Sequence, residues 1–201
     1  MCGISGSYLS SRVSLSKDQS EKILERIKHR GPDDQGMYQD INNNINLFHT
    51  RLAIQDISSL GHQPMLDYDK KIVLVFNGEI YNFHELRREL VKKGIKFRSS
   101  SDTEVLLKLY KEEGKEMLPK LNGIFAFALW DRSSKKLFLA RDNLGVKPLY
   151  YSATKDNFYF ASEIKALLPF LENEINLNIE SIQSYLSFLY CPGKDTPIKN
   201  V

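Results

Sequence analysis

The chain has 201 residues, 42% of them hydrophobic, which is enough apolar material for a single folded domain with a sizeable core. Its 28 basic residues exceed its 25 acidic ones by only three, and they lie in scattered pairs, so no nucleic-acid partner is expected. The longest apolar run, Ile124 to Trp130, is far shorter than the roughly 20 residues that span a bilayer, and the two cysteines and the absence of a leader-like N-terminus favour a cytoplasmic protein with no membrane partner.

Helical periodicity of apolar residues occurs in four segments of the chain. Ser16 followed by Gln19 is a capping-box pattern, which marks the start of the first helix. Ser101 followed by Glu104 is a second capping-box pattern, and it marks the start of the third. Glycine or proline follows each segment where the helix is expected to end. The predicted helices run over residues 17–29, 83–94, 101–114 and 178–191.

Five short runs between these helices have the composition of β-strands. Phe125, Phe127 and Leu129 alternate with smaller residues, and the polar sequence 131–134 follows them before the next apolar run. This pattern predicts an antiparallel hairpin. Antiparallel strands with helices outside them favour an α+β layered sandwich. The predicted strands run over residues 47–54, 72–76, 124–130, 136–141 and 158–161.

Cys2 is the first residue with distinctive chemistry. Loss of Met1 would leave Cys2 with a free α-amine, whose pKa of about 7.7 to 8.0 lies within reach of neutrality. That amine can accept the thiol proton directly or through a water, so one residue would supply both nucleophile and base. Taken alone, Cys2 could equally be an incidental small residue.

Five sequence blocks occur in order along the chain. They are MCGISG at 1–6, HRGPDD at 29–34, HTRLAI at 49–54, NGEIYN at 77–82 and ARDNLGVKPLYY at 140–151. Together the blocks resemble the class II glutamine amidotransferase domain of glutamine-hydrolysing asparagine synthetases, over essentially the whole chain. The resemblance implies the N-terminal-nucleophile hydrolase fold, a four-layer αββα sandwich of two antiparallel sheets. It also implies a single glutaminase domain over 1–201, with its core at about 2–170 and with 171–201 leading toward a synthetase domain.

The resemblance assigns the groups that act on the substrate amide. Cys2 matches the nucleophile, which would form a γ-glutamyl thioester. Asn77 and Gly78 match the oxyanion hole, where a side-chain amide and a backbone N–H stabilise the developing negative charge. An alternative for the pair Asn77-Gly78 is a plain hairpin turn, which this dipeptide suits well.

The resemblance also assigns the groups that hold the two charged ends of glutamine. Arg51 matches the residue that binds the α-carboxylate, a task suited to its planar fork. Glu79 and Asp102 match the positions that hold the α-ammonium. Without the family, Arg51 would be taken for an exposed arginine on a strand. Asp102 has an alternative as well, since an acid is favoured in the first turn of a helix whether or not a ligand is present.

The implied reaction is hydrolysis of L-glutamine to glutamate and ammonia, which would feed an amidation of the asparagine synthetase type. No cofactor is expected in this domain, because no Walker-type phosphate loop is present; ATP and magnesium are expected only in the synthetase domain. No metal is expected, because the four histidines lack paired ligand spacing. Arg30 and Asp33 are expected to be structural, and residues 141–148 to serve folding or the face toward the synthetase domain.

Two alternatives to this function stay open at the level of sequence. The ammonia acceptor could be something other than aspartate, such as a surface sugar or an antibiotic precursor. The chain could also be a non-catalytic regulatory domain, although the intact set Cys2, Arg51, Asn77, Glu79 and Asp102 argues against that alternative. A homodimer is left open beside the monomer.

Overall fold

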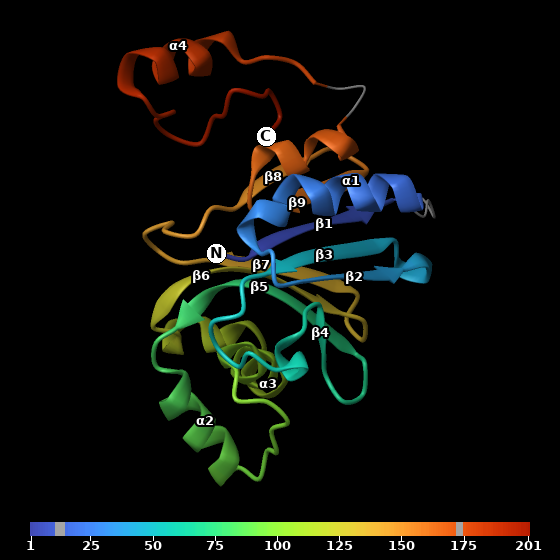
Figure 1. Ribbon diagram of the computed structural model, residues 1–201, viewed down its shortest axis with the longest axis vertical. Coiled ribbons are helices and arrows are strands. Elements are labelled where there is room, and N and C mark those ends of the chain that lie inside the picture. Colours follow the sequence, from blue (N-terminus) through green and yellow to red (C-terminus); the bar gives the residue numbers. More distant parts are fainter. Residues whose placement is uncertain (11–14, 172–174) are drawn as a thin grey trace.

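The computed structural model describes residues 1–10, 15–171 and 175–201, and in it two antiparallel sheets are stacked between helices (Figure 1). The five-stranded sheet contains, in spatial order, β2 (Asp34–Asp40), β3 (Ile45–Arg51), β1 (Gly3–Leu9), β9 (Asn157–Ala161) and β8 (Tyr150–Ala153). The four-stranded sheet contains β4 (Met65–Leu66), β5 (Ile72–Ile80), β6 (Gly123–Asp131) and β7 (Lys136–Arg141). The helices are α1 (Lys17–Ile27), α2 (Phe83–Lys92), α3 (Asp102–Glu113) and α4 (Ile179–Phe188).

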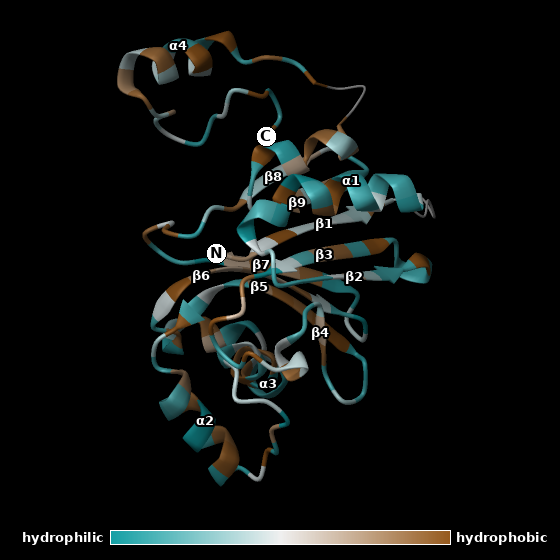
Figure 2. Cartoon of the chain, in the orientation of Figure 1, coloured by the Kyte–Doolittle hydropathy of each residue, from teal (hydrophilic) through white to brown (hydrophobic). Residues whose placement is uncertain are grey.

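The layers follow from the alternation of side chains along each strand. In β6, Phe127 and Leu129 pack against α2 and α3, while Ala128 and Trp130 pack between the two sheets. In β3, Phe48 packs against α1 instead. Figure 2 shows the resulting apolar strands between helices whose outer faces are polar. The order of layers is therefore α1, five-stranded sheet, four-stranded sheet, α2 with α3, which confirms the predicted αββα sandwich.

Most predicted elements are present within a few residues of their expected ends. The predicted hairpin is the pair β6 and β7. The first capping box forms with both of its hydrogen bonds. The second forms only in part: Ser101 accepts the backbone N–H of Glu104, but the Glu104 carboxylate turns back to the backbone of Arg98 and Ser99. Four strands, β1, β2, β4 and β8, were absent from the prediction, because their short or polar sequences carry little apolar alternation.

The hairpin-turn alternative for Asn77-Gly78 is wrong. Both residues lie inside the nine-residue strand β5, paired with Ala126 and Phe125 of β6. The strand continues past the predicted end at Phe76 because Gly78 packs closely against β6. A Cβ on Gly78 would lie 2.4 Å from the carbonyl oxygen of Ile124, so only glycine allows the two strands to approach this closely.

Most of the C-terminal segment 175–201 lies beyond the α1 layer (Figure 1), and its last residue, Val201, packs against the apolar cluster that contains Leu9 and Ile27. Asn178 caps α4 by accepting the N–H of Ser181, and Leu189, with a φ of 60°, ends the helix two residues before the predicted end at Cys191. The assignment of 171–201 as a link to a further domain stays a prediction. No helix in the described ranges is long and apolar enough to cross a membrane.

Candidate active site

Strand alternation aims two side chains of the five-stranded sheet at the other sheet. Leu47 of β3 packs between the sheets, so Arg51, four residues further on, faces the same way at the end of the strand. Ile4 of β1 also packs between the sheets, and Cys2, two residues earlier, continues that series. β1 and β3 are antiparallel, with Gly3 opposite Thr50, so the beginning of one strand meets the end of the other. Cys2 and Arg51 therefore lie at one edge of the inter-sheet layer.

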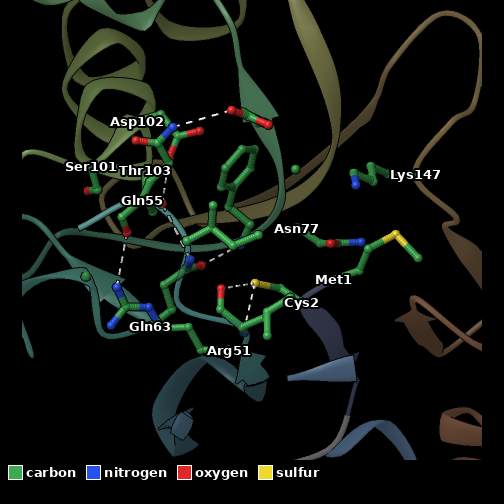
Figure 3. A pocket seen from close by; sticks show the side chains of 16 residues that line it. Met1, Cys2, Arg51, Gln55, Gln63, Asn77, Ser101, Asp102, Thr103 and Lys147 are labelled. Atoms are coloured by element: carbon green, nitrogen blue, oxygen red, sulfur yellow. Dashed lines mark hydrogen bonds between the residues drawn. The ribbon is translucent and has the colours of Figure 1, made fainter. Parts of the chain in front are cut away.

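The four-stranded sheet supplies the opposite wall. Val73 and Val75 of β5 pack between the sheets, and Asn77 and Glu79 follow at the same parity. A cavity forms where these residues meet the end of the other sheet, and Figure 3 shows Cys2 and Asn77 across it. All six residues predicted from the sequence line this cavity: Cys2, Arg51, Asn77, Gly78, Glu79 and Asp102. The fold thus brings together side chains that are up to a hundred positions apart in the chain.

The Cys2 thiol is half-enclosed by backbone groups. Its Sγ lies 3.4 Å from the backbone N of Leu52 and 3.7 Å from the Leu52 carbonyl oxygen. Burial raises the pKa of the Cys2 thiol, and the Leu52 hydrogen bond, the N-terminal ammonium and Arg51 lower it by less, while Asp102 adds to the rise. The thiol is therefore protonated at neutral pH in this state, so a nucleophilic role requires a base.

Beyond β4, the outer edge of β5 has no neighbouring strand, and side chains replace it. Phe76 donates its N–H to Gln63 Oε1 at 2.7 Å and accepts at its carbonyl from His49 Nε2 at 3.1 Å. Ile80 donates its N–H to Asp102 Oδ2 at 3.0 Å. Backbone groups of alternate residues point to the same side of a strand, so the N–H of Gly78 points to this open side as well. The short β4 thus leaves a backbone donor directed at the cavity.

His49 is a neutral donor in this arrangement. Its ring is fully buried, and burial lowers the pKa of His49 to about 3. A neutral imidazole has one N–H, and the Phe76 carbonyl receives it, which places the proton on Nε2. Nδ1 is buried and makes no hydrogen bond to the described part of the chain.

Asn77 carries a second donor toward the cavity. The residue is 1% exposed, and its Nδ2 has no hydrogen-bond partner among residues 1–10, 15–171 and 175–201. A buried amide N–H without a partner costs roughly 1 to 3 kcal/mol, so its presence at a cavity wall indicates a group that is completed by a ligand.

Arg51 is buried rather than exposed, so the surface alternative is wrong. It is 6% exposed, and backbone carbonyls of the loop that follows β3 hold its guanidinium. NH1 donates to the Ser58 carbonyl at 2.9 Å, and NH2 donates to the carbonyls of Gln55 and Asp56. The Asp56 carboxylate in turn accepts the N–H of Ser100 at 2.7 Å. These bonds fix the loop, whose residues Ile54, Gln55 and Gly61 line the cavity, and they set the plane of the guanidinium.

Asp102 and Glu79 form an acidic corner opposite Arg51. Asp102 is the first residue of α3 and is 3% exposed. Burial raises the pKa of the Asp102 carboxyl, and the negative charge of Glu79 raises it further, while backbone N–H groups of Ile80 and Thr103 oppose the rise. Glu79 accepts from Gln55 Nε2 at 3.4 Å. Burial and mutual repulsion disfavour the charged forms of these two carboxylates, so a cationic ligand would stabilise them.

The sequence prediction missed several residues of the cavity wall. Gln63 and Gln55 lie on the long connection between β3 and β5, and Thr103 follows Asp102 in α3. No spacing or periodicity marks the two glutamines, because their position depends on how the connection folds back. The missed wall residues are Met1, Leu52, Ile54, Gln55, Gly61, Gln63, Phe76, Ser101, Thr103 and Lys147. Among the described residues, no group of three or more His, Cys, Asp or Glu side chains could hold a metal ion.

Comparison with known proteins places this cavity in a family context. Residues 1–201 match the family described as the glutamine amidotransferase domain. The chain is 41% identical over 199 residues to asparagine synthetase (glutamine-hydrolyzing) 1 of Bacillus subtilis, covering 98% of this chain and 31% of that protein. It is 38% identical over 218 residues to putative asparagine synthetase (glutamine-hydrolyzing) 2 of Methanocaldococcus jannaschii, covering 100% of this chain and 42% of that protein. The chain thus spans about a third to two fifths of these relatives.

A solved structure has a similar fold. It is a glutamine phosphoribosylpyrophosphate amidotransferase from B. subtilis complexed with ADP and GMP, with a TM-score of 0.66 at 23% identity, covering 83% of this chain and 43% of that one. At that identity the likeness supports the fold, and it agrees with the layered arrangement described above.

Proposed function

The chain belongs to the glutamine amidotransferase domain family, and from this premise we propose that Cys2, as the N-terminal residue after removal of Met1, hydrolyses glutamine through a γ-glutamyl thioester. The observation that carries the proposal is the buried Asn77 Nδ2, which has no hydrogen-bond partner among the described residues and lies on the wall of the cavity that also contains the Cys2 thiol. A donor kept free of protein partners beside a nucleophile is the arrangement that a tetrahedral oxyanion requires.

The proposed reaction has two halves. The Cys2 amine takes the thiol proton, directly or through a water, and the thiolate attacks the γ-carbonyl carbon of glutamine. The oxyanion accepts hydrogen bonds from Asn77 Nδ2 and the backbone N–H of Gly78. When the C–N bond breaks, the ammonium of Cys2 gives its proton to the leaving nitrogen and ammonia departs. Water then attacks the thioester with the amine as base, which releases glutamate and restores the thiol.

The charges at the two ends of the cavity match an amino acid. Arg51 supplies a positive group at one end for the α-carboxylate, although NH1 and NH2 are engaged by loop carbonyls in this state, so binding uses other donors or a shift of the loop. Asp102 and Glu79 supply negative charge for the α-ammonium. A zwitterion satisfies both ends at once, whereas an amide without these charges would leave them uncompensated.

We propose that the ammonia serves an amidation of the asparagine synthetase type, carried out by a further domain. Support comes from the names of the relatives, which are asparagine synthetases, and from their length, which exceeds that of this chain more than twofold. A different acceptor is the second candidate. It is favoured by a 37% identical relative from Gibberella zeae over 85% of this chain, which bears the name amidase chry2.

Replacement of the nucleophile tests the proposal. We expect Cys2→Ala to abolish ammonia release from glutamine while leaving the melting temperature nearly unchanged, because the half-buried thiol contributes little packing. A diazo or chloroketone analogue of glutamine should add one covalent label to the mature wild-type protein, located at Cys2 by mass spectrometry. Cys191→Ala is the matched control, and it should keep both ammonia release and covalent labelling at Cys2. Labelling at Cys191 in place of Cys2 would contradict the assignment.

A further inference from the structure

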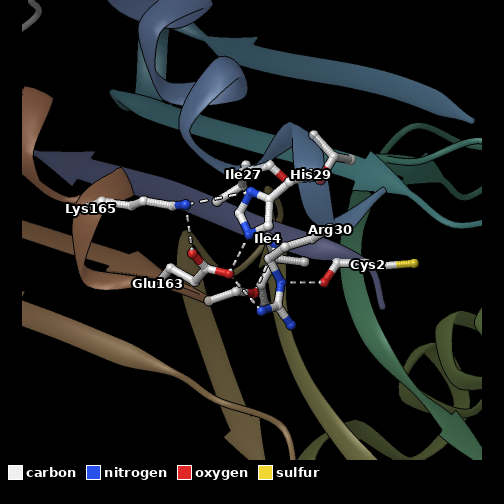
Figure 4. A network of polar contacts seen from close by, with 9 residues as sticks. Cys2, Ile4, Ile27, His29, Arg30, Glu163 and Lys165 are labelled. Atoms are coloured by element: carbon white, nitrogen blue, oxygen red, sulfur yellow. Dashed lines mark hydrogen bonds and ion pairs between the residues drawn. The ribbon is translucent and has the colours of Figure 1, made fainter. Parts of the chain in front are cut away.

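The backbone of Cys2 is held by a polar cluster outside the cavity (Figure 4). Arg30, at the end of the short helical turn after α1, donates Nε–H to the Cys2 carbonyl at 2.9 Å. Its NH1 donates to Glu163 Oε1 at 2.8 Å. The same carboxylate oxygen lies 2.9 Å from His29 Nε2, and Lys165 Nζ lies 3.2 Å from Oε2. Glu163 therefore connects three cationic or polar side chains, of which only Arg30 contacts the candidate nucleophile.

Cys2 depends on such contacts more than the residues after it do. Regular pairing of β1 with β3 begins at Gly3, and the first residues of a chain are poorly ordered unless something holds them. Ile4 is already fixed, because its N–H and carbonyl bond to the side chain and backbone of Ser162. Within the described part of the chain, the hydrogen bonds of Cys2 are those between its sulfur and Leu52 and the one from Arg30 to its carbonyl.

Arg30 needs a partner of its own to hold this position. Its side chain is 7% exposed, and its NH2 is buried without a hydrogen bond to any described residue. A buried guanidinium is costly unless a carboxylate compensates the charge. Two bonds, to the Cys2 carbonyl and to Glu163, fix the plane of the group, whereas the first alone would let it rotate. The hydrogen bonds from Arg30, His29 and Lys165 outweigh burial and lower the pKa of Glu163, so the carboxylate is charged at neutral pH.

We propose that Glu163 is a positioning residue for the glutaminase reaction, which fixes Arg30 against the Cys2 carbonyl and thereby orients the Cys2 thiol and amine. The inference rests on the proposed function. Glu163 is not among the described residues that line the cavity, so its effect is expected on the orientation of the nucleophile rather than on substrate affinity.

Glu163→Gln tests this role, because it keeps the size of the side chain and removes its charge. We expect kcat for ammonia release to fall roughly tenfold to a hundredfold, since small misplacements of a reacting group cost that much, while KM for glutamine changes less than twofold. The matched control is Glu113→Gln, which removes a carboxylate at the end of α3 that pairs with Lys93 and Lys120 and that is not among the described residues lining the cavity. If Glu163 had only a structural role, both variants would have a lower melting temperature, and their kcat values would be the same.

A double variant tests whether Glu163 acts through Arg30. If it does, adding Glu163→Gln to Arg30→Lys should lower kcat no further than Arg30→Lys alone, because the coupled contact is already lost. Full additivity would overturn the proposal, as would a kcat for Glu163→Gln equal to that of Glu113→Gln. If Glu163→Gln does not fold, Glu163→Asp keeps the charge and shortens its reach, and the same fall in kcat at unchanged KM is expected.

The rate of Cys2 alkylation by iodoacetamide separates this inference from the proposed function, because that reaction needs no glutamine. Glu163→Gln should change the Cys2 alkylation rate severalfold relative to Glu113→Gln, measured by mass spectrometry on mature protein. A wild-type protein that releases no ammonia from glutamine would end the proposed function, and the alkylation comparison would still decide the role of Glu163. An unchanged alkylation rate in an active protein would overturn the inference alone.

Discussion

At the residue scale, the thiol of Cys2 illustrates how burial and chemistry oppose each other. The thiolate is the reactive form, but the enclosed position raises the pKa of Cys2 and favours the neutral thiol. A base must therefore stand within reach. His49 is a poor candidate for this base, because burial lowers its pKa to about 3 and it is not among the described residues that line the cavity. The α-amine of a mature Cys2 is the group left in the proposed mechanism.

Retention of Met1 should therefore inactivate the protein. An amide nitrogen in place of the free amine is no base near neutral pH, whereas a terminal amine has a pKa of about 7.7 to 8.0. Intact-mass analysis separates the two forms, and ammonia release measured on each gives the comparison. In the mature form, activity should rise with pH through the pKa of the amine. Equal specific activity in the two forms would show that another group deprotonates Cys2.

For Asp102, a role in binding the substrate and a role in capping α3 predict different effects of mutation. Ser101 caps α3, so Asp102→Asn should leave the melting temperature nearly unchanged. If Asp102 pairs with the α-ammonium, kcat/KM for glutamine should fall by about 2 kcal/mol or more in transition-state stabilisation. A small loss of stability with unchanged kinetics is the result that a capping role gives.

The pH dependence of kcat/KM supplies a second test of Asp102→Asn. Burial raises the pKa of Asp102, so the carboxylate is protonated as pH falls through a value above that of an ordinary aspartate. The wild-type kcat/KM should fall over that range because the charge for the ammonium is lost. Asp102→Asn has no such charge to lose, so its profile should lack this acid limb. An acid limb of the same size in the variant would assign it to another group.

At the scale of single elements, β5 is the strand on which the candidate site depends. On its inner face, the apolar Val73 and Val75 are followed by the polar Asn77 and Glu79. On its open edge lies the N–H of Gly78. The same strand therefore packs the core over its first half and lines the cavity over its second. The change from core to cavity wall occurs where β4, which is two residues long, no longer pairs with β5. Beyond that point Gln63, His49 and Asp102 bond to the edge of β5 in place of a strand.

Gly78→Ala should disturb both functions of β5. The added Cβ would meet the Ile124 carbonyl at 2.4 Å, so β5 and β6 must separate locally, at a cost of roughly 1 to 3 kcal/mol of unfolding free energy. Ammonia release should fall because the backbone donor moves away from the oxyanion. Denaturant unfolding and kinetics measured on one preparation test both. Gly94→Ala, at a φ of 84° with open space around it, is the control and should lose stability without losing activity. Full stability in Gly78→Ala would contradict the close packing described here.

At the scale of the whole molecule, the layer between the sheets and the C-terminal segment differ in what they contribute. Trp130 is fully buried between the sheets, whereas Leu186 of α4 is 73% exposed. Trp130→Ala should lower the free energy of unfolding by about 3 to 5 kcal/mol, since it leaves a large cavity. Leu186→Ala should change it by less than about 0.5 kcal/mol. Chemical denaturation of both variants decides, and a large loss for Leu186→Ala would show that α4 packs on the sandwich.

The local patterns in the sequence were sufficient for the elements with strong periodicity. The capping box at Ser16, the apolar stripe of α3 and the alternation in β6 each involve residues within one or two turns or one hairpin, so short-range geometry determines them. The family blocks contain Cys2, Arg51 and Asn77, and each block is likewise a contiguous piece of chain. The structure brings these residues together with Asp102, which lies outside the blocks, on the wall of one cavity, and their roles there stay predictions.

Only the tertiary structure decided the contacts between blocks. That Asn77-Gly78 is a strand rather than a turn follows from its pairing with β6, and that Arg51 is buried follows from the loop that folds over it. The connection of Cys2 to Arg30 and Glu163 joins three segments of the chain, with 28 positions between Cys2 and Arg30 and 133 between Arg30 and Glu163. No local pattern encodes such contacts, because they form only when two sheets and a helix stack, and the packing free energy of the whole sandwich, rather than any local preference, holds them in place.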